Sequence, residues 1–339
     1  MQDTFSQKIQ NIYYVIAILI GATLILVYTK SILIPFILAG FIMLVVNPLI
    51  DFFIKEFKTP RWISVLFVAF LITLLLGLIA LLITSSINSI LKNIDEYKMR
   101  VTQITASSAY ILEDFGYAFD SAQQEHLTNS LRILPIFNYI SKTANALMGV
   151  AGEAFIVFLF VLFMIGSQAG NLQKSALFVE INNKIRIYLL AKLFASLATG
   201  LLTWLVLELL GLDMAPMFGA LAFLLNFIPN IGSIIAILLP IPIAILQFTE
   251  IWRIAMAVGI PSFIQFLIGN ILEPKFLGES LDLHPIAILI ALMFWGMIWG
   301  ITGMLLAAPI LVIIKISLDK IPQAKFYSEL LSGRIHVSE

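Results

Sequence analysis

Eight long stretches with few or no charged side chains dominate this sequence, and they constrain its fold more than any other feature. The hydrocarbon core of a bilayer is about 30 Å thick, so a helix needs about 20 apolar residues to cross it. With 60% hydrophobic and only 12% charged residues, the chain has too little polar surface for a water-soluble domain. We therefore predict an all-α integral membrane protein built as a polytopic helical bundle.

Six of these stretches have the length of one membrane crossing. They are residues 12–28, 32–54, 62–83, 146–166, 187–211 and 252–272. The first follows Lys8 and lacks a small-residue cleavage motif, so we interpret it as an uncleaved first helix and not as a signal peptide.

The other two stretches, residues 214–248 and 285–318, are too long for one ordinary crossing. As straight helices with a rise of 1.5 Å per residue, each would reach about 50 Å. The first is interrupted by Asn226-Phe-Ile-Pro-Asn-Ile-Gly-Ser233 and the second by Gly296-Met-Ile-Trp-Gly-Ile-Thr-Gly303. Proline and glycine weaken the helical hydrogen-bond ladder, so we predict two broken or re-entrant helical hairpins. The protein then has six to eight membrane spans.

The two long stretches share a spacing of prolines and glycines. Each opens near a proline, breaks at a glycine 16 to 18 residues later, and reaches another proline 6 to 8 residues after that. The residues are Pro216, Gly232 and Pro240 in the first stretch, and Pro285, Gly303 and Pro309 in the second. The spacing indicates a repeated hairpin, and a chance arrangement of prolines is the alternative.

The basic residues predict the orientation, because Lys and Arg near span ends favour the cytoplasm. With the N-terminus inside, 13 of the 20 Lys and Arg residues fall on the cytoplasmic side. Both termini are then cytoplasmic, whether or not the hairpins cross. We divide the chain into spans 1–3 (1–87), an extramembrane helical segment (88–145), spans 4–5 (146–211), a transport core (212–318) and a cytoplasmic tail (319–339).

The extramembrane segment carries an apolar seam with a period of 3.5 residues on a helix that continues the third span. The seam consists of Ile90, Ile94, Tyr97, Val101, Ile104, Ser108, Ile111 and Phe115. One possible partner is a second helix, which begins at a capping box of Ser121 and Gln124 and ends before Pro135. The other is a second copy of the protein, and the sequence leaves both open.

Composition and motifs exclude several classes of function. The 20 basic and 20 acidic residues balance, so no basic excess supports nucleic-acid binding. The chain has no cysteine, and its three histidines are scattered. It also lacks the phosphate-binding loop of ATPases and the motifs of serine hydrolases and zinc proteases. We expect no enzyme, no cofactor and no metal site.

The break at residues 226–233 is the strongest candidate for a binding site. Amide side chains and unpaired backbone groups at membrane depth are costly unless protein or a polar cavity satisfies them. Ser233 is expected to cap the second half-helix, whose positive end would point at whatever occupies the break. Broken helices of this kind frame substrates in many secondary transporters. A surface turn between two short helices is the alternative.

Polar residues also lie on two of the ordinary spans. Ser262, Gln265, Gly269 and Glu273 share one face of residues 252–272, with Asn270 adjacent, and Lys192, Ser196, Thr199 and Thr203 share one face of residues 187–211. Such faces more often seal helix contacts by hydrogen bonds than line a path. Glu273 is expected in a solvated loop, neutralised by Lys275, and close helix packing is the alternative role of Gly296 and Gly300.

Four segments together resemble the autoinducer-2 exporter family of bacterial permeases. They are the 226–233 motif, Asn270-Ile-Leu-Glu-Pro-Lys275, Leu281-Asp-Leu-His-Pro-Ile286 and Gly303-Met-Leu-Leu-Ala-Ala-Pro309. The resemblance implies a bacterial inner-membrane protein, a homo-oligomer with a pentamer as one expected form, that moves a small solute without ATP. Members are linked to export of autoinducer-2 or to sodium–proton exchange, and many have no assigned solute.

We predict a secondary transporter that exports a small polar solute, with the tips of the two hairpins approaching each other around it. The substrate-binding or gating residues are expected to be Asn226, Pro229, Asn230, Gly232, Ser233, Gln265, Asn270, Glu273, Gly300, Thr302 and Gly303. The second hypothesis is a cation–proton antiporter of the same fold that uses Glu273 or Glu153. The third is a membrane scaffold without transport activity.

Overall fold

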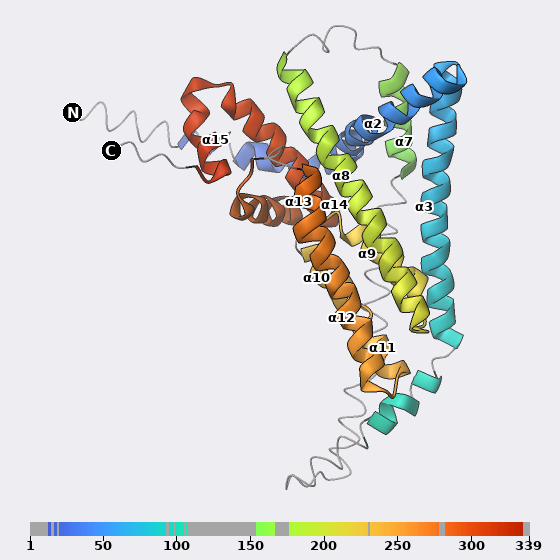
Figure 1. Cartoon of the computed structure of the whole chain (residues 1–339). Coiled ribbons are helices and arrows are strands. Elements are labelled where there is room, and N and C mark those ends of the chain that lie inside the picture. Colours follow the sequence, from blue (N-terminus) through green and yellow to red (C-terminus); the bar gives the residue numbers. More distant parts are fainter. Residues whose placement is uncertain are drawn as a thin grey trace, which may run out of the picture. The chain divides into compact units, whose positions relative to one another are not determined.

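The computed structural model describes residues 13–14, 17–18, 20–92, 95–97, 99–104, 106, 154–166, 176–229, 231–277 and 282–334 (Figure 1). All regular structure in these residues is helical, which confirms the predicted all-α class. Glu153, Asn230 and the expected helix from Ser121 to Pro135 lie outside the described residues.

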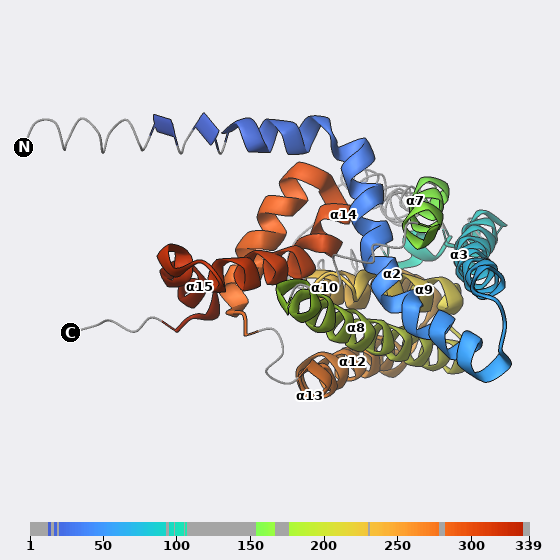
Figure 2. The same ribbon diagram turned by 90° about the horizontal axis from the view of Figure 1, so that it is seen from above.

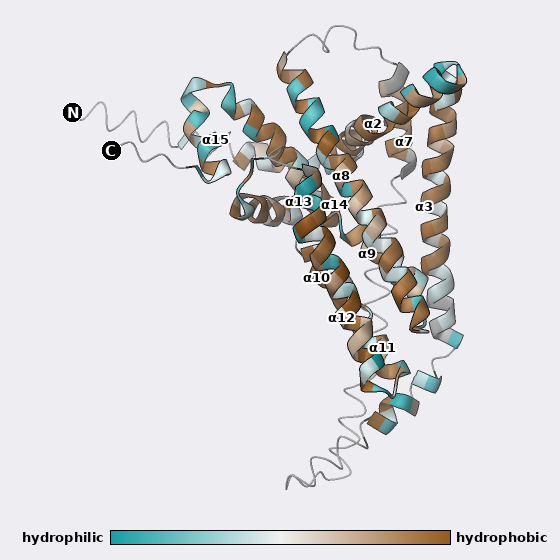
Figure 3. Cartoon of the chain, in the orientation of Figure 1, coloured by the Kyte–Doolittle hydropathy of each residue, from teal (hydrophilic) through white to brown (hydrophobic). Residues whose placement is uncertain are grey.

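Five helices are long and apolar enough to cross a membrane, as the polytopic prediction requires. They cover Lys30–Phe57, Arg61–Ser86, Ala176–Leu209, Ile251–Phe276 and Pro285–Asp319. Figure 3 shows these helices mostly in the colour of hydrophobic residues, whereas α15 (Lys325–Ser332) carries both hydrophilic and hydrophobic residues. Helix α8 (Ala176–Leu209) begins 11 residues before the predicted fifth span. The prediction required apolar residues and therefore left out the first turns of the helix, which carry polar side chains such as Glu180 and Arg186.

The helices group into two units. The first contains α2 (Lys30–Phe57), α7 (Ala154–Gly166), the beginning of α8 up to Leu189, α14 (Pro285–Asp319), η3 (Pro322–Ala324) and α15. The second contains α3 (Arg61–Lys92), the rest of α8, α9 (Ala215–Leu225), α10 (Ile231–Leu238), α11 (Ile241–Gln247), α12 (Ile251–Leu267), η2 (Ile268–Leu272) and α13 (Glu273–Leu277).

In the first unit, α2 packs against α7 through an apolar cluster. Ala39 of α2 is fully buried between Val157 and Val161 of α7, and the side chains of Met43 and Met164 extend the contact. The two helices meet where α2 carries a small residue, which lets them approach closely as membrane helices commonly do.

Helix α14 folds back on itself in the middle. Gly300 has φ 63° and ψ −143°, a conformation that is essentially restricted to glycine. The Nζ of Lys315 lies 2.9 Å from the Oδ2 of Asp282, although a straight helix would separate these two ends by about 50 Å. Figure 2 shows the two limbs of α14 joined at this bend. Residues 285–319 therefore form the second predicted hairpin.

The second unit is built around the C-terminal part of α8. Ala195 of α8 packs against Ile264 and Ile268 on the helix formed by α12 and η2. On α9, the backbone of Gly219 approaches Gly200 of α8 so closely that a methyl group at either position would collide with the other helix. Small residues thus bring α9 and the α12–η2 helix close to α8, as in other membrane bundles.

The first long stretch is also a hairpin, with an additional interruption. Helix α9 ends at Leu225, α10 and α11 follow, and Leu239 and Pro240 separate the last two. The side chain of Gln247 donates a hydrogen bond to the carbonyl of Gly211 and accepts one from the backbone N–H of Asp213, both at 2.7 Å. The beginning and end of this stretch therefore lie side by side.

The repeated spacing of glycines corresponds to a repeated contact. A Cβ atom on Gly232 would collide with the carbonyl oxygen of Leu225, and one on Gly303 would collide with that of Trp295. In a straight helix, residues seven or eight apart are more than 10 Å from each other along the axis. Both glycines therefore close a tight reversal of the chain, which confirms the predicted repeat at these two positions.

The described part of the apolar seam packs within its own unit. Tyr97 and Val101 form a buried cluster with Leu246 of α11, and Ile104 packs against it. The Tyr97 hydroxyl donates a 2.6 Å hydrogen bond to Asp213, next to the base of the first hairpin. Burial raises the pKa of Tyr97 above its ordinary value, and the Asp213 carboxylate raises this pKa further. Neither partner predicted for the seam accounts for this contact.

Candidate functional site

Asn226, at the break of the first hairpin, is the centre of a buried polar network in the second unit. Its side chain is almost completely buried, and its Nδ2 donates a hydrogen bond of 3.1 Å to the Ser196 hydroxyl of α8. Its Oδ1 accepts a hydrogen bond of 2.8 Å from the Nε2 of Gln265 on α12. The amide therefore joins three separate segments, and its polar atoms are satisfied where apolar surroundings would otherwise make them costly.

Gln265 connects the two sides of the same break. Its Nε2 also donates a hydrogen bond to the hydroxyl of Ser233, which lies in the first turn of α10. The predicted capping role of Ser233 is wrong, because α10 begins at Ile231 and a cap precedes its helix. The serine faces α12 and binds a side chain there instead.

The polar face of α8 is buried along four successive positions. Lys192, Ser196, Thr199 and Thr203 are each at most 6% exposed. Thr199 Oγ1 has no hydrogen-bond partner among the residues that the structure describes. A buried polar atom without a partner requires an explanation, and contact with a transported solute would supply one.

Lys192 forms an ion pair with Glu273 at the far end of this polar face. The Nζ of Lys192 lies 2.7 Å from Glu273 Oε1, and the two side chains are 7% and 14% exposed. The expectation of a solvated loop in which Lys275 neutralises Glu273 is therefore wrong, because Glu273 continues the helix and pairs with α8. A π-helical segment, η2, precedes Glu273 and changes its angular position relative to Gln265.

Three predicted site residues thus belong to one hydrogen-bonded cluster that joins α8, the first hairpin and α12. They are Asn226, Ser233 and Gln265, and Ser196 of α8 is the fourth member. The Lys192–Glu273 ion pair lies about one turn from Ser196 along α8. Gly232 lies at the same break, where its missing side chain makes room for the Leu225 carbonyl. Pro229 is half-buried in the turn between α9 and α10.

Asn270 does not join this cluster. Its side chain is exposed, and its Nδ2 donates a hydrogen bond to the Phe266 carbonyl of the preceding turn. Asn270 and Gln265 point in different directions from the same helix, so the role predicted for Asn270 in the binding site stays a prediction.

The residues predicted at the second break lie in the other unit. Gly300 provides the bend, and Thr302 and Gly303 are buried immediately after it. The rings of Trp295 and Trp299 pack with their centroids 4.6 Å apart before the bend. A Cβ atom on Gly300 would meet no neighbouring atom within 4 Å, so the backbone conformation of this glycine and not close helix packing explains it. The approach of the two hairpin tips stays a prediction.

The base of the second hairpin is held by charges. Asp282 contacts Lys315 at 2.9 Å and Arg334 at 2.8 Å, and Lys315 also lies 3.7 Å from Asp319. The hydrogen bond from Lys315 is the main cause that lowers the pKa of Asp282 below its ordinary value. No group of three or more His, Asp or Glu side chains suited to a metal occurs among the described residues.

Sequence reasoning noticed Lys192 and Ser196 but did not include them among the site residues. Their spacing of four residues on an apolar helix was the available signal, and it is ambiguous because such faces usually seal helix contacts. Whether Lys192 and Ser196 belong to the site depends on the residues that they contact. These contacts, with Glu273 and Asn226, are visible only in the structure.

Comparison with known proteins extends over almost the whole chain. The model of the AI-2E family transporter family matches residues 14–323. A candidate transport protein of Borreliella burgdorferi is 31% identical over 345 residues, which cover 96% of this chain and 91% of that protein. A candidate transport protein of Haemophilus influenzae is 30% identical over 335 residues, or 94% and 93% of the two chains.

One relative has a more specific name. The AI-2 transport protein TqsA of Escherichia coli is 28% identical over 333 residues, which cover 94% of this chain and 95% of TqsA. The described helices and these similarities together indicate a multi-pass membrane transporter.

Proposed function

Because the chain belongs to the AI-2E transporter family, we propose that it exports a small polar solute without ATP, and that this solute binds at the polar cluster of the second unit. The proposed site comprises the hydrogen-bonded cluster of Ser196, Asn226, Ser233 and Gln265 together with the neighbouring Lys192–Glu273 ion pair. Membrane transport is the function of the family.

The observation that carries this proposal is the position of Gln265. Its amide holds Asn226 and Ser233, one on each side of the break in the first hairpin. A solute with hydroxyl or carbonyl groups would compete for these same donors and acceptors, and a hydrogen bond exchanged for another costs little net free energy. Solute binding would thereby release the hairpin from α12.

Thr199 supports the same location. It follows Ser196 by three residues on the buried face of α8, so the two hydroxyls are neighbours on the helix surface. Its hydroxyl has no partner in the described part of the chain and is therefore available to a bound solute. Autoinducer-2, a small and hydroxyl-rich molecule, fits this chemistry, and we propose it as the first solute to test because of TqsA.

The test is efflux of autoinducer-2 from proteoliposomes, followed with a reporter for the released molecule. The variant Gln265→Leu keeps the volume of the side chain approximately and removes both hydrogen bonds, so we expect at least a tenfold loss of flux. Asn270→Leu is the matched control, because this residue lies on the same helix, is exposed and donates its side-chain hydrogen bond to the Phe266 carbonyl of that helix. Equal flux for Gln265→Leu and Asn270→Leu would contradict the proposed site.

A second candidate function, cation–proton antiport, is favoured by the Lys192–Glu273 ion pair. Buried ion pairs are costly to form, and ionisable residues inside membrane helices commonly mark ion or proton pathways. In this mechanism Glu273 would accept a proton or a cation when it separates from Lys192.

Sodium addition to vesicles that contain a pH-sensitive dye tests this alternative. An antiporter would change the internal pH, and Glu273→Gln would abolish the change. The charge swap Lys192→Glu with Glu273→Lys separates a structural pair from a carrier of protons, because a structural pair tolerates the exchange. If sodium causes no pH change in vesicles with the wild-type protein, antiport is excluded and the first proposal stays intact.

We further propose an inner-membrane homo-oligomer, for example a pentamer, with both termini in the cytoplasm. Since the sequence contains no cysteine, a single Lys325→Cys substitution on α15 provides a unique label. A membrane-impermeant thiol reagent should label it only in opened cells or inverted vesicles. Labelling in intact spheroplasts would contradict the proposed cytoplasmic position of the C-terminus.

A further inference from the structure

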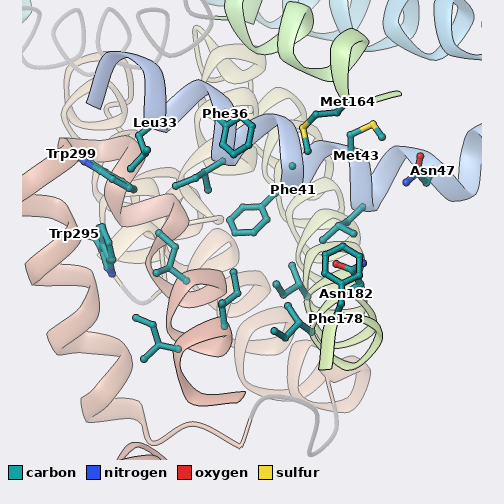
Figure 4. Close-up of a pocket in the computed structure, with 18 of the residues that line it drawn as sticks. Leu33, Phe36, Phe41, Met43, Asn47, Met164, Phe178, Asn182, Trp295 and Trp299 are labelled. Carbon is teal, nitrogen blue, oxygen red and sulfur yellow. The ribbon is translucent and has the colours of Figure 1, made fainter. Parts of the chain in front are cut away.

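The first unit contains a large apolar cavity that the proposed function does not use. Its volume is about 780 Å³, and α2, α7, the beginning of α8 and α14 surround it (Figure 4). Most of its lining is aliphatic or aromatic, including Leu33, Phe36, Phe41, Trp295, Trp299 and Ile310. A volume of this size lies within the range of ligand-binding pockets in proteins, about 300–1,000 Å³.

A smaller polar pocket of about 360 Å³ adjoins the cavity. The two share Leu44, Asn47, Phe178 and Asn182 as lining residues, so they are continuous. The smaller pocket adds the polar residues Asp51, Asn183 and Arg186, and Arg61 lines the larger one. Polarity therefore rises along α2 from Leu33 to Asp51, over about 27 Å of helix.

The apolar part is poorly suited to water. A buried water molecule requires two to four polar partners, and the lining around Phe36, Phe41 and Trp295 offers apolar surface. An empty cavity would forfeit the dispersion contacts of its lining. In a helix bundle surrounded by lipid, the medium available to fill such a cavity is an acyl chain.

The polar part presents opposite charges that are not paired with each other. Asp51 and Arg186 line the same pocket, yet no ion pair within 4.0 Å joins them among the described residues. Arg61 provides a second positive charge on the adjoining wall. The arrangement complements a headgroup with one negative and one positive group.

We propose that these two pockets together form a binding site for a zwitterionic phospholipid with a primary ammonium group, of the phosphatidylethanolamine type. The acyl chains occupy the apolar cavity and the phosphate lies between Arg61 and Arg186. The ammonium group contacts Asp51 and the side-chain oxygen of Asn47.

The ammonium group distinguishes this lipid from its relatives. A primary ammonium carries three hydrogen-bond donors, whereas a trimethylated choline headgroup has none to offer Asp51. An anionic glycerol headgroup would leave the Asp51 carboxylate without a positive partner. Arginine is well suited to phosphate, because its planar group donates two parallel hydrogen bonds.

Native mass spectrometry of the delipidated full-length protein in detergent tests the proposal. Palmitoyl-oleoyl phosphatidylethanolamine is compared with the phosphatidylcholine and phosphatidylglycerol of the same chains, and with glycerophosphoethanolamine, which has no chains. We expect the ethanolamine lipid to bind at least threefold more tightly than either other lipid, and the chain-free headgroup to bind at least tenfold more weakly. Equal binding of all three lipids would overturn the headgroup assignment.

Two variants locate the binding in these pockets. Gly40 lines the cavity, and a Cβ atom there would meet only the end of the Met164 side chain at 3.9 Å. The variant Gly40→Leu therefore starts without a backbone collision at Cβ and adds apolar volume at the cavity wall. We expect this variant to lose lipid binding. Asp51→Asn should remove the preference for ethanolamine over choline and retain the binding of both.

The matched control is Lys55→Gln, which removes an exposed charge one turn further along α2 and lines neither pocket. It should bind the ethanolamine lipid as the wild type does. Normal lipid binding by Gly40→Leu would show that the lipid does not occupy this cavity, and the proposal would be wrong. The proposal would also be wrong if the wild type bound no lipid and Gly40→Leu changed the oligomeric state, because the cavity would then hold another copy or segment of the protein.

Discussion

The two hairpins share one geometry and differ in chemistry. In each, a glycine packs against the backbone carbonyl at the end of the preceding half-helix, Gly232 against Leu225 and Gly303 against Trp295. The break of the first hairpin carries hydrogen-bonded polar side chains, whereas a pair of tryptophans precedes the bend of the second. The tight reversal is therefore a structural requirement, and the polar network is an addition specific to one hairpin.

The bases of the hairpins differ in the same sense. Neutral hydrogen bonds of Gln247 join the two ends of the first hairpin, and the ion pairs of Asp282 and Lys315 join those of the second. Neutral bonds do not respond to pH, while ion pairs do. Two hairpins with the same backbone geometry can therefore be held together at their bases by interactions that differ in their sensitivity to pH.

The largest expected effect comes from the two closing glycines. Gly232→Ala and Gly303→Ala each place a methyl group against a backbone carbonyl, so we expect each to destabilise the protein by about 1–3 kcal/mol or more. Thermal unfolding in detergent measures the effect. Gly259→Ala is the control, because nothing lies near its Cβ position and a helical alanine is favourable. Sensitivity at only one of the two glycines would break the equivalence of the hairpins.

The second effect concerns the two bases. Lys315→Met removes one cationic partner of Asp282 and leaves the pair with Arg334, and we expect a loss of about 1–3 kcal/mol in stability. Gln247→Leu removes two neutral hydrogen bonds, each worth about 0.5–1.5 kcal/mol. High salt should change the difference between wild type and variant only for Lys315→Met. A salt response of Gln247→Leu would contradict the distinction.

The third effect is a pH dependence that belongs to the second base alone. The pKa of Asp282 is lower in the folded protein than its ordinary value of 3.8, so its contribution is complete above about pH 4. Stability is lost as the pH falls through the folded-state pKa, because the protonated carboxyl no longer pairs with Lys315. Melting temperatures between pH 3 and 7 should show a smaller acid loss for Asp282→Asn than for the wild type.

The smallest effect is expected at a surface pair of the same unit. Lys320 lies 2.8 Å from Glu180, and both side chains are more than one third exposed. The hydrogen bond that Lys320 donates to the Glu180 carboxylate raises the pKa of Lys320, but solvent and salt screen such pairs strongly. Glu180→Gln should leave the melting temperature unchanged within experimental error. A clear decrease would mean that this pair helps to hold the charged base.

The sequence predicted the membrane class and both breaks because these follow from local properties. Apolar length sets the number of helices, and proline and glycine disturb the helical ladder wherever they lie. The position of Gly300 and the end of α9 at Leu225 agree with the predicted interruptions. The error at Ser233 is local as well, since a shift of the helix start by a few residues moves the cap.

Partner choice was much less predictable. Glu273 was expected to pair with Lys275, two residues away, and it pairs with Lys192, 81 residues away. The apolar seam at Tyr97 and Val101 met Leu246 of the first hairpin, which no periodicity could identify. A periodic pattern shows that one face of a helix needs a partner, and it contains no information about which one.

The amino-acid order by itself determined that this chain lies in a membrane, where its helices are interrupted, and which side chains are too polar to remain unpaired there. Tertiary structure alone decided that Asn226, Gln265 and Ser196 satisfy one another and that Lys192 neutralises Glu273. The physical reason is range. Helix formation and bilayer partition depend on neighbouring residues, whereas a buried hydrogen bond or ion pair depends on which distant helices pack together.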